Sequence, residues 1–209
     1  MTSIYLVRHA QAVGNLERRF QGHTDHPLTP MGILQARSVG HRFQALPIRQ
    51  VYTSPLRRAY DTAAAIASIH GQAPVREPGL IEINGGDLED RLFDELSAIY
   101  PEEYRNFIEA PHSFTAVGQG ETYRQVYERM RDVTLELADR HRGQTIVLVS
   151  HGCALRCLLS YAMGLPLQRM NEVPWGQNTG VSHLLFSEAS LPAVAYTWDI
   201  THLPDAQIT

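Results

Sequence analysis

Residues 145–152 have the sequence TIVLVSHG, and this stretch indicates the fold class. Its first five residues are apolar or β-branched, which is typical of a short strand buried on both faces of a parallel sheet. An apolar segment of helical length follows directly, from Gly152 to Met163, and ends at Gly164. A buried strand that leads straight into a helix is the repeating unit of an α/β fold.

The same alternation extends in both directions along the chain. Short apolar or β-rich runs predict further strands at residues 3–7, 50–53, 73–76, 181–186 and 193–198. Helices are predicted at 29–45, 54–70 and 121–142. Thr29-Pro30 and Ser54-Pro55 are each typical of an N-cap followed by proline at the first helical position. The pattern predicts an α/β protein, a three-layer α/β/α sandwich around a mostly parallel sheet.

Residues 83–120 interrupt this alternation. Pro101, Pro111 and Gly118 divide the segment into short pieces, and a helix is expected only at 89–100. We interpret the segment as an irregular cap insertion, and we expect residues 1–209 to form a single domain, since their number suits one core.

Composition excludes several classes of protein. Hydrophobic residues make up 44% of the 209 residues, which excludes a largely disordered chain. A net charge of −4 argues against a general nucleic-acid surface. The longest apolar region, 145–167, contains His151 and Arg156, so we predict no membrane span. The cysteines, Cys153 and Cys157, are expected to pack within a helix, and a cytoplasmic location follows from such sparse cysteine use. A homodimer is left open.

Two histidines follow two of the predicted strands. The strand at 3–7 leads into Arg8-His9, and the strand at 145–149 leads through Ser150 into His151-Gly152. Ligands of such folds bind at the carboxyl ends of the strands, so these histidines are expected to meet. One histidine there is usually a hydrogen-bonded structural residue. A pair beside an arginine and a glycine favours an anion site, in which Gly152 lets the N–H groups of a helix N-terminus approach a phosphate.

Other polar segments are weaker signals. Arg57 and Arg58 lie in the first turn of a predicted helix, where arginines normally face solvent, and Glu82 precedes a glycine-rich stretch. His23, Asp25 and His26 form a cluster that resembles a metal site. It has no partner spacing of the known metal motifs, so we predict no metal and no cofactor.

The ordered set of these segments resembles the histidine phosphatase superfamily, also called phosphoglycerate mutase-like. The matching segments are Arg8-His9-Ala10, Asn15, Gln21-Gly22, Leu28-Thr29, Gly32, Gln35-Ala36, Thr53 to Ala59, Thr62-Ala63, Leu80-Ile81-Glu82, Gly86-Asp87, Glu89, Gly120-Glu121-Thr122 and Ser150-His151-Gly152. They extend over residues 4–185. Ala10 stands where the family usually has glycine and is expected to fit if its φ is negative. Leu88-Glu89-Asp90 also departs from the family pattern and affects only details of the substrate pocket.

The resemblance implies a role for each matching position. His9 would be the nucleophile that becomes phosphohistidine, and Glu82 would donate a proton to the leaving group. Arg8, Arg58 and His151 would bind the phosphoryl oxygens. The resemblance selects Arg58 over Arg57, between which spacing alone does not choose. Asn15, Gln21, Gly22 and Gly152 would complete the phosphate and substrate pocket.

These residue types suit phosphoryl transfer. Positive groups must neutralise the phosphate oxygens, and nearby arginines keep an imidazole neutral and nucleophilic. We therefore expect an enzyme, a cytoplasmic, metal-independent phosphatase that acts on small phosphomonoesters such as sugar phosphates or phosphorylated acids. The alternatives are a cofactor-dependent phosphoglycerate mutase, which would use the same residues, and a catalytically weak binding or regulatory module.

Overall fold

The computed structural model describes residues 1–187 and 191–209, and its centre is a six-stranded sheet of order β3-β2-β4-β1-β5-β6. The strands are β1 (Thr2–Arg8), β2 (Ile48–Thr53), β3 (Val75–Arg76), β4 (Thr145–Ser150), β5 (Val181–Phe186) and β6 (Ala193–Asp199). β3, β2, β4 and β1 pair in parallel, whereas β5 is antiparallel to both β1 and β6. The sheet is mixed, and the predicted α/β class is confirmed.

The central strand β4 is apolar on both faces, as its sequence predicts. Ile146 and Leu148 belong to the core cluster on one side of the sheet, and Val147 and Val149 belong to the cluster on the other. All four are fully buried. β4 pairs with β1 as far as Arg8 and Ser150, so the residues that follow these two strands leave the sheet at the same edge.

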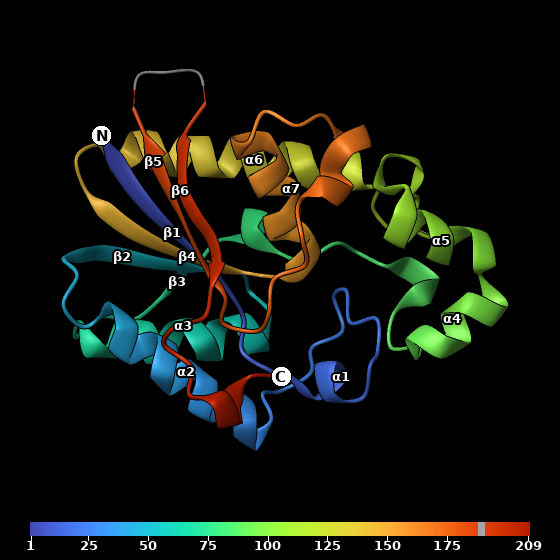
Figure 1. The fold of residues 1–209 in the computed structure, drawn as a ribbon, viewed down its shortest axis with the longest axis horizontal. Coiled ribbons are helices and arrows are strands. Elements are labelled where there is room, and N and C mark those ends of the chain that lie inside the picture. The colour runs from blue at the N-terminus through green and yellow to red at the C-terminus, as the bar shows by residue number, and fades with distance from the viewer. Residues whose placement is uncertain (188–190) are drawn as a thin grey trace.

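Helices cover both faces of the sheet (Figure 1). On one face lie α2 (Pro30–Phe43) and α3 (Arg57–Ile69), and on the other lie α6 (Tyr123–Arg140) and α7 (Gly152–Ala162). The three-layer prediction is confirmed. Within residues 1–187 and 191–209, none of the helices has both the length and the apolar character that crossing a membrane requires.

Shorter helices connect these elements. They are α1 (Val13–Leu16), α4 (Phe93–Ile99) and α5 (Pro101–Glu109), with 3₁₀ turns at Pro78–Leu80, Gly86–Leu88, Pro111–Ser113, Leu167–Glu172 and Asp205–Gln207.

The segment 83–120 forms the predicted cap. It projects from the right-hand side of Figure 1 and contains α4 and α5. Backbone hydrogen bonds join it to the loop after β1, since Phe20 donates its N–H to Arg91 O (2.9 Å) and accepts the Asp90 N–H (2.8 Å) at its own carbonyl. The cap is therefore fastened beside the edge of the sheet where β1 and β4 end.

Two predicted helix boundaries are wrong. The second helix does not begin at Ser54-Pro55 but at Arg57, because the Ser54 hydroxyl bonds to Leu56 N and to His151 instead of capping a helix. The helix expected at 89–100 begins only at Phe93, since the preceding Asp90 has a positive φ of 61°.

A close backbone contact fixes the start of α2. Thr29 caps the helix by accepting the Gly32 N–H, and a Cβ added at Gly32 would lie 2.0 Å from Gln11 O. We expect Gly32→Ala to lower the free energy of unfolding by about 2 kcal/mol, because the gain of about 1 kcal/mol in helix propensity cannot offset this overlap. Urea denaturation measures the difference. Leu34→Ala, at an exposed position of α2, is the control and should change stability by less than about 0.5 kcal/mol.

Candidate active site

A cavity of about 310 Å³ opens where β1 and β4 end. The predicted residues that line it are Arg8, His9, Asn15, Gln21, Gly22, Arg58, Glu82 and Gly152. His151 does not line the cavity but is fully buried against His9, with ring centroids 5.1 Å apart. The fold thus brings the predicted site residues together, although they come from segments far apart in the sequence.

His9 is held as a neutral imidazole with one nitrogen available. Its Nδ1 donates to Ala10 O (2.7 Å), so the lone pair is on Nε2. Burial, followed by the charges of Arg58 and Arg8, lowers the pKa of His9 well below 6.5. Ala10 is not among the described residues with positive φ, so alanine fits here as expected.

Arg58 is almost fully buried, and within the described residues its guanidinium bonds to carbonyls and not to a carboxylate. Its Nη1 donates to Thr24 O and its Nη2 to Gly22 O, both at 2.7 Å. Burial lowers the pKa of Arg58 to about 10, so it stays charged at neutral pH. Arg57, by contrast, is exposed and pairs with Asp61. The expectation that arginines in this turn face solvent is therefore wrong for Arg58, because the loop at 22–24 supplies carbonyls for its guanidinium.

Several polar atoms around the cavity are buried without a hydrogen-bond partner in the described part of the chain. They are Arg8 Nε, Arg58 Nε, Gln21 Oε1 and His151 Nδ1. Buried polar groups are normally hydrogen-bonded, so such a cluster calls for a functional explanation. Three of the four atoms are nitrogens of basic side chains, and the two guanidinium N–H groups suit an anion.

A serine that the sequence did not single out fixes the orientation of His151. The Ser54 hydroxyl lies 2.7 Å from His151 Nε2 and accepts the Leu56 N–H (3.3 Å). If it donates its own proton to Nε2, Nδ1 of His151 carries the ring proton. Burial, with Arg58 and His9, lowers the pKa of His151 well below 6.5. In that tautomer, His151 is a neutral imidazole that can donate a hydrogen bond from Nδ1.

The carboxylate of Glu82 occupies the N-terminus of α7. Its Oε1 accepts the N–H groups of Ile83 and Ala154 (both 3.0 Å), and its Oε2 accepts that of Cys153 (3.1 Å). We expected Gly152 to open this helix N-terminus to a phosphate. That expectation is wrong for the Cys153 and Ala154 N–H groups, because a protein carboxylate already satisfies them.

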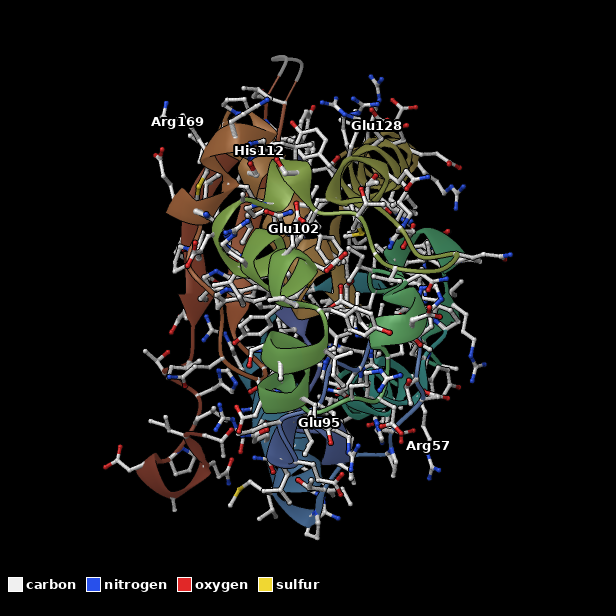
Figure 2. All side chains as sticks on the ribbon, turned by 90° about the vertical axis from the view of Figure 1, so that its right-hand side faces the viewer. Arg57, Glu95, Glu102, His112, Glu128 and Arg169 are labelled. Carbon is white, nitrogen blue, oxygen red and sulfur yellow. The ribbon has the colours of Figure 1, made fainter. Side chains whose placement is uncertain are left out.

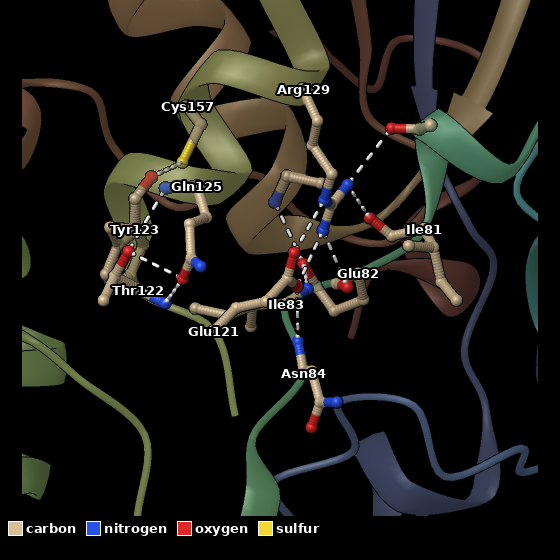
Figure 3. Close-up of polar contacts among 12 residues, drawn as sticks. Ile81, Glu82, Ile83, Asn84, Glu121, Thr122, Tyr123, Gln125, Arg129 and Cys157 are labelled. Carbon is tan, nitrogen blue, oxygen red and sulfur yellow. Dashed lines mark hydrogen bonds and ion pairs between the residues drawn. The ribbon is translucent and has the colours of Figure 1, made fainter. Parts of the chain in front are cut away.

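The backbone around Glu82 is fixed by an arginine on α6 (Figure 3). Arg129 Nη1 donates to Ile81 O (2.6 Å) and Gly79 O (3.1 Å), and Nη2 donates to Glu82 O (2.9 Å). Its Nε donates to Glu121 Oε1 (3.0 Å). Although burial raises the pKa of Glu121, this ion pair outweighs it and lowers the pKa. Sequence reasoning missed Arg129, which looks like any basic residue on the polar face of an amphipathic helix.

Glu89 fixes the loop that holds Arg58. Its Oε1 accepts the N–H groups of His23 (2.8 Å) and Gly85 (2.9 Å), and His23 is flanked by the two carbonyls that bind Arg58. His23 also bonds through Nε2 to Glu82 O (2.8 Å), and His26 bonds to Asp90. The cluster once considered as a metal site therefore connects the loop to the cap. Among the described residues, no group of three or more metal-ligating side chains is found.

The far wall of the cavity is aromatic. Phe20, Phe93, Phe107 and Trp175 line it, and Phe107 lies 4.9 Å from Phe20 and 5.8 Å from Trp175 between ring centroids. Trp175 has an exposed fraction of 43% and forms part of the wall.

Comparisons with known proteins agree with this geometry. The sequence pattern of the histidine phosphatase superfamily (branch 1) matches residues 4–199. "Probable phosphoglycerate mutase GpmB" of Cronobacter sakazakii is 36% identical, covering 97% of this chain and 95% of that protein. "Phosphoserine phosphatase 1" of Hydrogenobacter thermophilus is 34% identical, covering 81% and 80%.

Solved structures agree as well. Bacillus stearothermophilus YhfR superimposes with a TM-score of 0.92 at 31% identity, covering 97% of this chain and 99% of that one. A phosphoserine phosphatase from Entamoeba histolytica, in complex with 3-phosphoglyceric acid, has a TM-score of 0.86 at 28% identity, covering 98% and 100%.

The lowered pKa values of His9 and His151 predict a pH-dependent stability. Below pH 6.5 these two histidines bind protons in the unfolded chain, whereas in the folded protein their buried imidazoles stay neutral. Acid therefore favours unfolding. As the pH falls from 7.0 to 5.5, each of the two histidines should lower the free energy of unfolding by about 1 kcal/mol. His151→Asn should reduce the fall by that amount in urea titrations at the two pH values. Leu34→Ala, which keeps every titratable group, should show the wild-type fall. An equal fall in His151→Asn contradicts the prediction.

Proposed function

The chain belongs to the histidine phosphatase superfamily, and from this premise we propose that it is a phosphatase that hydrolyses small phosphomonoesters through a phosphohistidine on His9. The observation that carries the proposal is the set of unpartnered N–H groups of Arg8 and Arg58 in a cavity beside neutral His9. These groups suit the oxygens of a phosphoryl dianion, whose charge must be offset before a nucleophile can approach.

The first step forms a phosphoenzyme. Nε2 of His9 attacks phosphorus, the N–P bond forms, and the bond from phosphorus to the ester oxygen breaks. The two guanidiniums and the Nδ1–H of His151 hold the three peripheral oxygens. Positive charge develops on His9 as it attacks, and the Ala10 carbonyl that accepts its Nδ1–H stabilises this charge.

Glu82 supplies the proton that the leaving alkoxide needs. It is the one carboxyl group that lines the cavity among the described residues. Oε1 already accepts two backbone N–H groups and Oε2 only one, so we assign the proton to Oε2. The same carboxylate then removes a proton from water, which attacks phosphorus, releases phosphate and restores neutral His9. The reaction is thereby divided into two easier steps.

We propose that the reaction is metal-independent, because Arg8 and Arg58 supply the positive charge that a metal supplies elsewhere. The substrate is a small phosphate ester, in line with the size of the cavity. We place the enzyme in the cytoplasm.

A second candidate is a phosphoglycerate mutase. It is favoured by the relative named as a mutase, which aligns with almost the full chain. A mutase would keep the phosphoryl group on His9 and return it to a second hydroxyl group of the substrate. Stimulation by bisphosphoglycerate, with interconversion of 2- and 3-phosphoglycerate and little release of phosphate, would identify this reaction.

His9→Ala tests the phosphohistidine. We expect the release of phosphate from p-nitrophenyl phosphate to fall at least about 1,000-fold, because the variant lacks the imidazole nitrogen that stands beside Arg8 and Arg58 with its lone pair free. The matched control is His112→Ala, at an exposed position of the cap, which should keep wild-type activity (Figure 2). EDTA should leave the wild-type rate unchanged. After a rapid quench of the reaction with a substrate radiolabelled in its phosphoryl group, acid-labile label should be found on the wild-type protein and not on His9→Ala. Equal labelling of His9→Ala contradicts the assignment.

Glu82→Gln separates proton donation from binding. For an alkyl phosphate, whose leaving group must be protonated, we expect kcat to fall about 10²- to 10⁴-fold. For p-nitrophenyl phosphate the fall should be far smaller, because p-nitrophenolate is stable without a proton. Steady-state kinetics on both esters measure the difference. Glu102→Gln, an exposed carboxylate on the cap, is the control (Figure 2). Equal losses on the two esters would assign Glu82 to binding.

A further inference from the structure

The cavity has two chemically different ends. Arg8, His9, Arg58 and Glu82 form one end, where the phosphoryl group is proposed to bind. The other wall is formed by Phe20, Ile83, Phe93, Phe107, Ile108 and Trp175. An alcohol attached to a phosphoryl group at the first end must lie against this apolar wall, so the wall determines which phosphate esters fit.

We infer that the enzyme selects phosphomonoesters of aromatic or bulky apolar alcohols over those whose alcohol bears a carboxylate. The inference rests on the proposed function and specifies its substrate class. It distinguishes this chain from relatives whose names refer to phosphoserine or phosphoglycerate, since both compounds carry a carboxylate.

The charges around the cavity disfavour a carboxylate. Besides Arg8 and Arg58, the cationic side chain that lines the cavity in the described part of the chain is Arg19. Its Nε donates to Glu17 Oε2 (2.6 Å) and its Nη1 to Asp90 O (2.6 Å), and the Asp90 carboxylate lies 3.8 Å from Nε. The charge of Arg19 is therefore already offset, and a substrate carboxylate would lose water without gaining an ion pair.

Trp175 is held in place rather than loosely exposed. The guanidinium of Arg156 lies 4.0 Å from the centroid of its ring, a favourable cation–π distance. Arg156 is itself buried, with Nε bonded to Val173 O (3.0 Å), and no carboxylate pairs with it among the described residues. A charge buried in this way is stabilised by the ring and the carbonyl, so the two side chains form one rigid unit.

The same unit is connected to the phosphoryl end. Arg8 Nη1 donates to the carbonyl of Gly176, the residue after Trp175. A Cβ added at Gly152 would lie 3.3 Å from the Trp175 ring and 3.7 Å from Arg8 Nε. The indole therefore stands directly beside the arginine that is proposed to bind phosphate, at the place where the first carbons of the alcohol must lie.

The cap supplies much of the rest of the wall and keeps its polar side outward. Phe93 of α4 and Phe107 of α5 line the cavity, while Glu95 and Glu102 on the same helices are exposed (Figure 2). The rings pack against one another across elements, with Phe93 and Phe107 centroids 6.4 Å apart. A preformed aromatic wall binds an apolar group with little loss of side-chain entropy.

The test compares esters that differ in the alcohol but not in leaving-group chemistry. Phosphate release is measured with 2-phenylethyl phosphate, ethyl phosphate, O-phosphoserine and 3-phosphoglycerate, all esters of alkyl alcohols. We expect kcat/KM for 2-phenylethyl phosphate to exceed that for ethyl phosphate by about 10- to 100-fold, the effect of burying one ring. O-phosphoserine and 3-phosphoglycerate should rank at or below ethyl phosphate.

Two variants locate the selectivity. Trp175→Ala should remove about tenfold of the preference for 2-phenylethyl over ethyl phosphate. Ile108→Lys places a cation on a partly exposed residue of the wall and should lower the ratio of 2-phenylethyl phosphate to O-phosphoserine about tenfold. The control is Tyr60→Ala, which removes a ring stacked on Arg76 outside the cavity and should not change these ratios.

The outcomes separate the inference from the proposed function. If O-phosphoserine or 3-phosphoglycerate equals or exceeds 2-phenylethyl phosphate, the substrate class is overturned while the phosphatase assignment stands. If Trp175→Ala lowers kcat/KM for all four esters equally, the aromatic subsite is overturned. If none of the esters releases phosphate in the folded wild type, the proposed function itself fails.

Discussion

The guanidiniums of buried Arg58 and half-buried Arg8 lie beside an uncharged imidazole, and the need to keep this arrangement stable explains much of the structure. A buried cation is costly unless polar groups surround it. Arg58 meets this requirement through the carbonyls of Gly22 and Thr24, and Arg8 through that of Gly176. Neutral oxygens stabilise the arginines without cancelling their charge, whereas carboxylates would compete with a substrate phosphate. Burial, followed by the same two charges, lowers the pKa of His9 and keeps it neutral, so the arginines contribute both to anion binding and to the nucleophilic state proposed for His9.

Supplying those carbonyls requires loops of unusual geometry. Gly22 has a φ of 49°, and a Cβ there would lie 2.3 Å from Glu89 Oε1, so a side chain would be strained and would displace the carboxylate that holds the loop. Glu82 is also held by contacts from other elements, since Arg129 of α6 binds its backbone carbonyl and the N-terminus of α7 binds its carboxylate. The N–H groups at the start of α7 thus hold the carboxyl group of Glu82 in position, and the arginines are left for the proposed anion.

How much of this structure the sequence predicts depends on how far apart in the sequence the interacting residues lie. Residues 145–152 indicated the fold because the pattern of a strand that is apolar on both faces can be recognised within the strand itself. His9, His151 and Arg58 could be located from strand ends and from a family resemblance. Ser54, Arg129 and Trp175 could not, because each acts through a partner distant in the sequence. Ser54 looked like a helix cap, and only the tertiary contact with His151 reveals its part in the site.

The groups proposed for chemistry and the side chains proposed to contact the alcohol come largely from different parts of the chain. This arrangement explains how relatives with such different names can share one fold. His9 and His151 directly follow β1 and β4, whose register fixes their relative positions, and Arg58 stands at the start of α3. Much of the far wall belongs to the cap, which is fastened to the body by backbone bonds such as Phe20 N to Arg91 O. Changes in Phe93 or Phe107 alter the surface that meets the alcohol without moving His9. Substrate choice can therefore change through the rings of α4 and α5 while the proposed phosphoryl site stays intact, as long as Glu89 of the cap still holds the loop that binds Arg58.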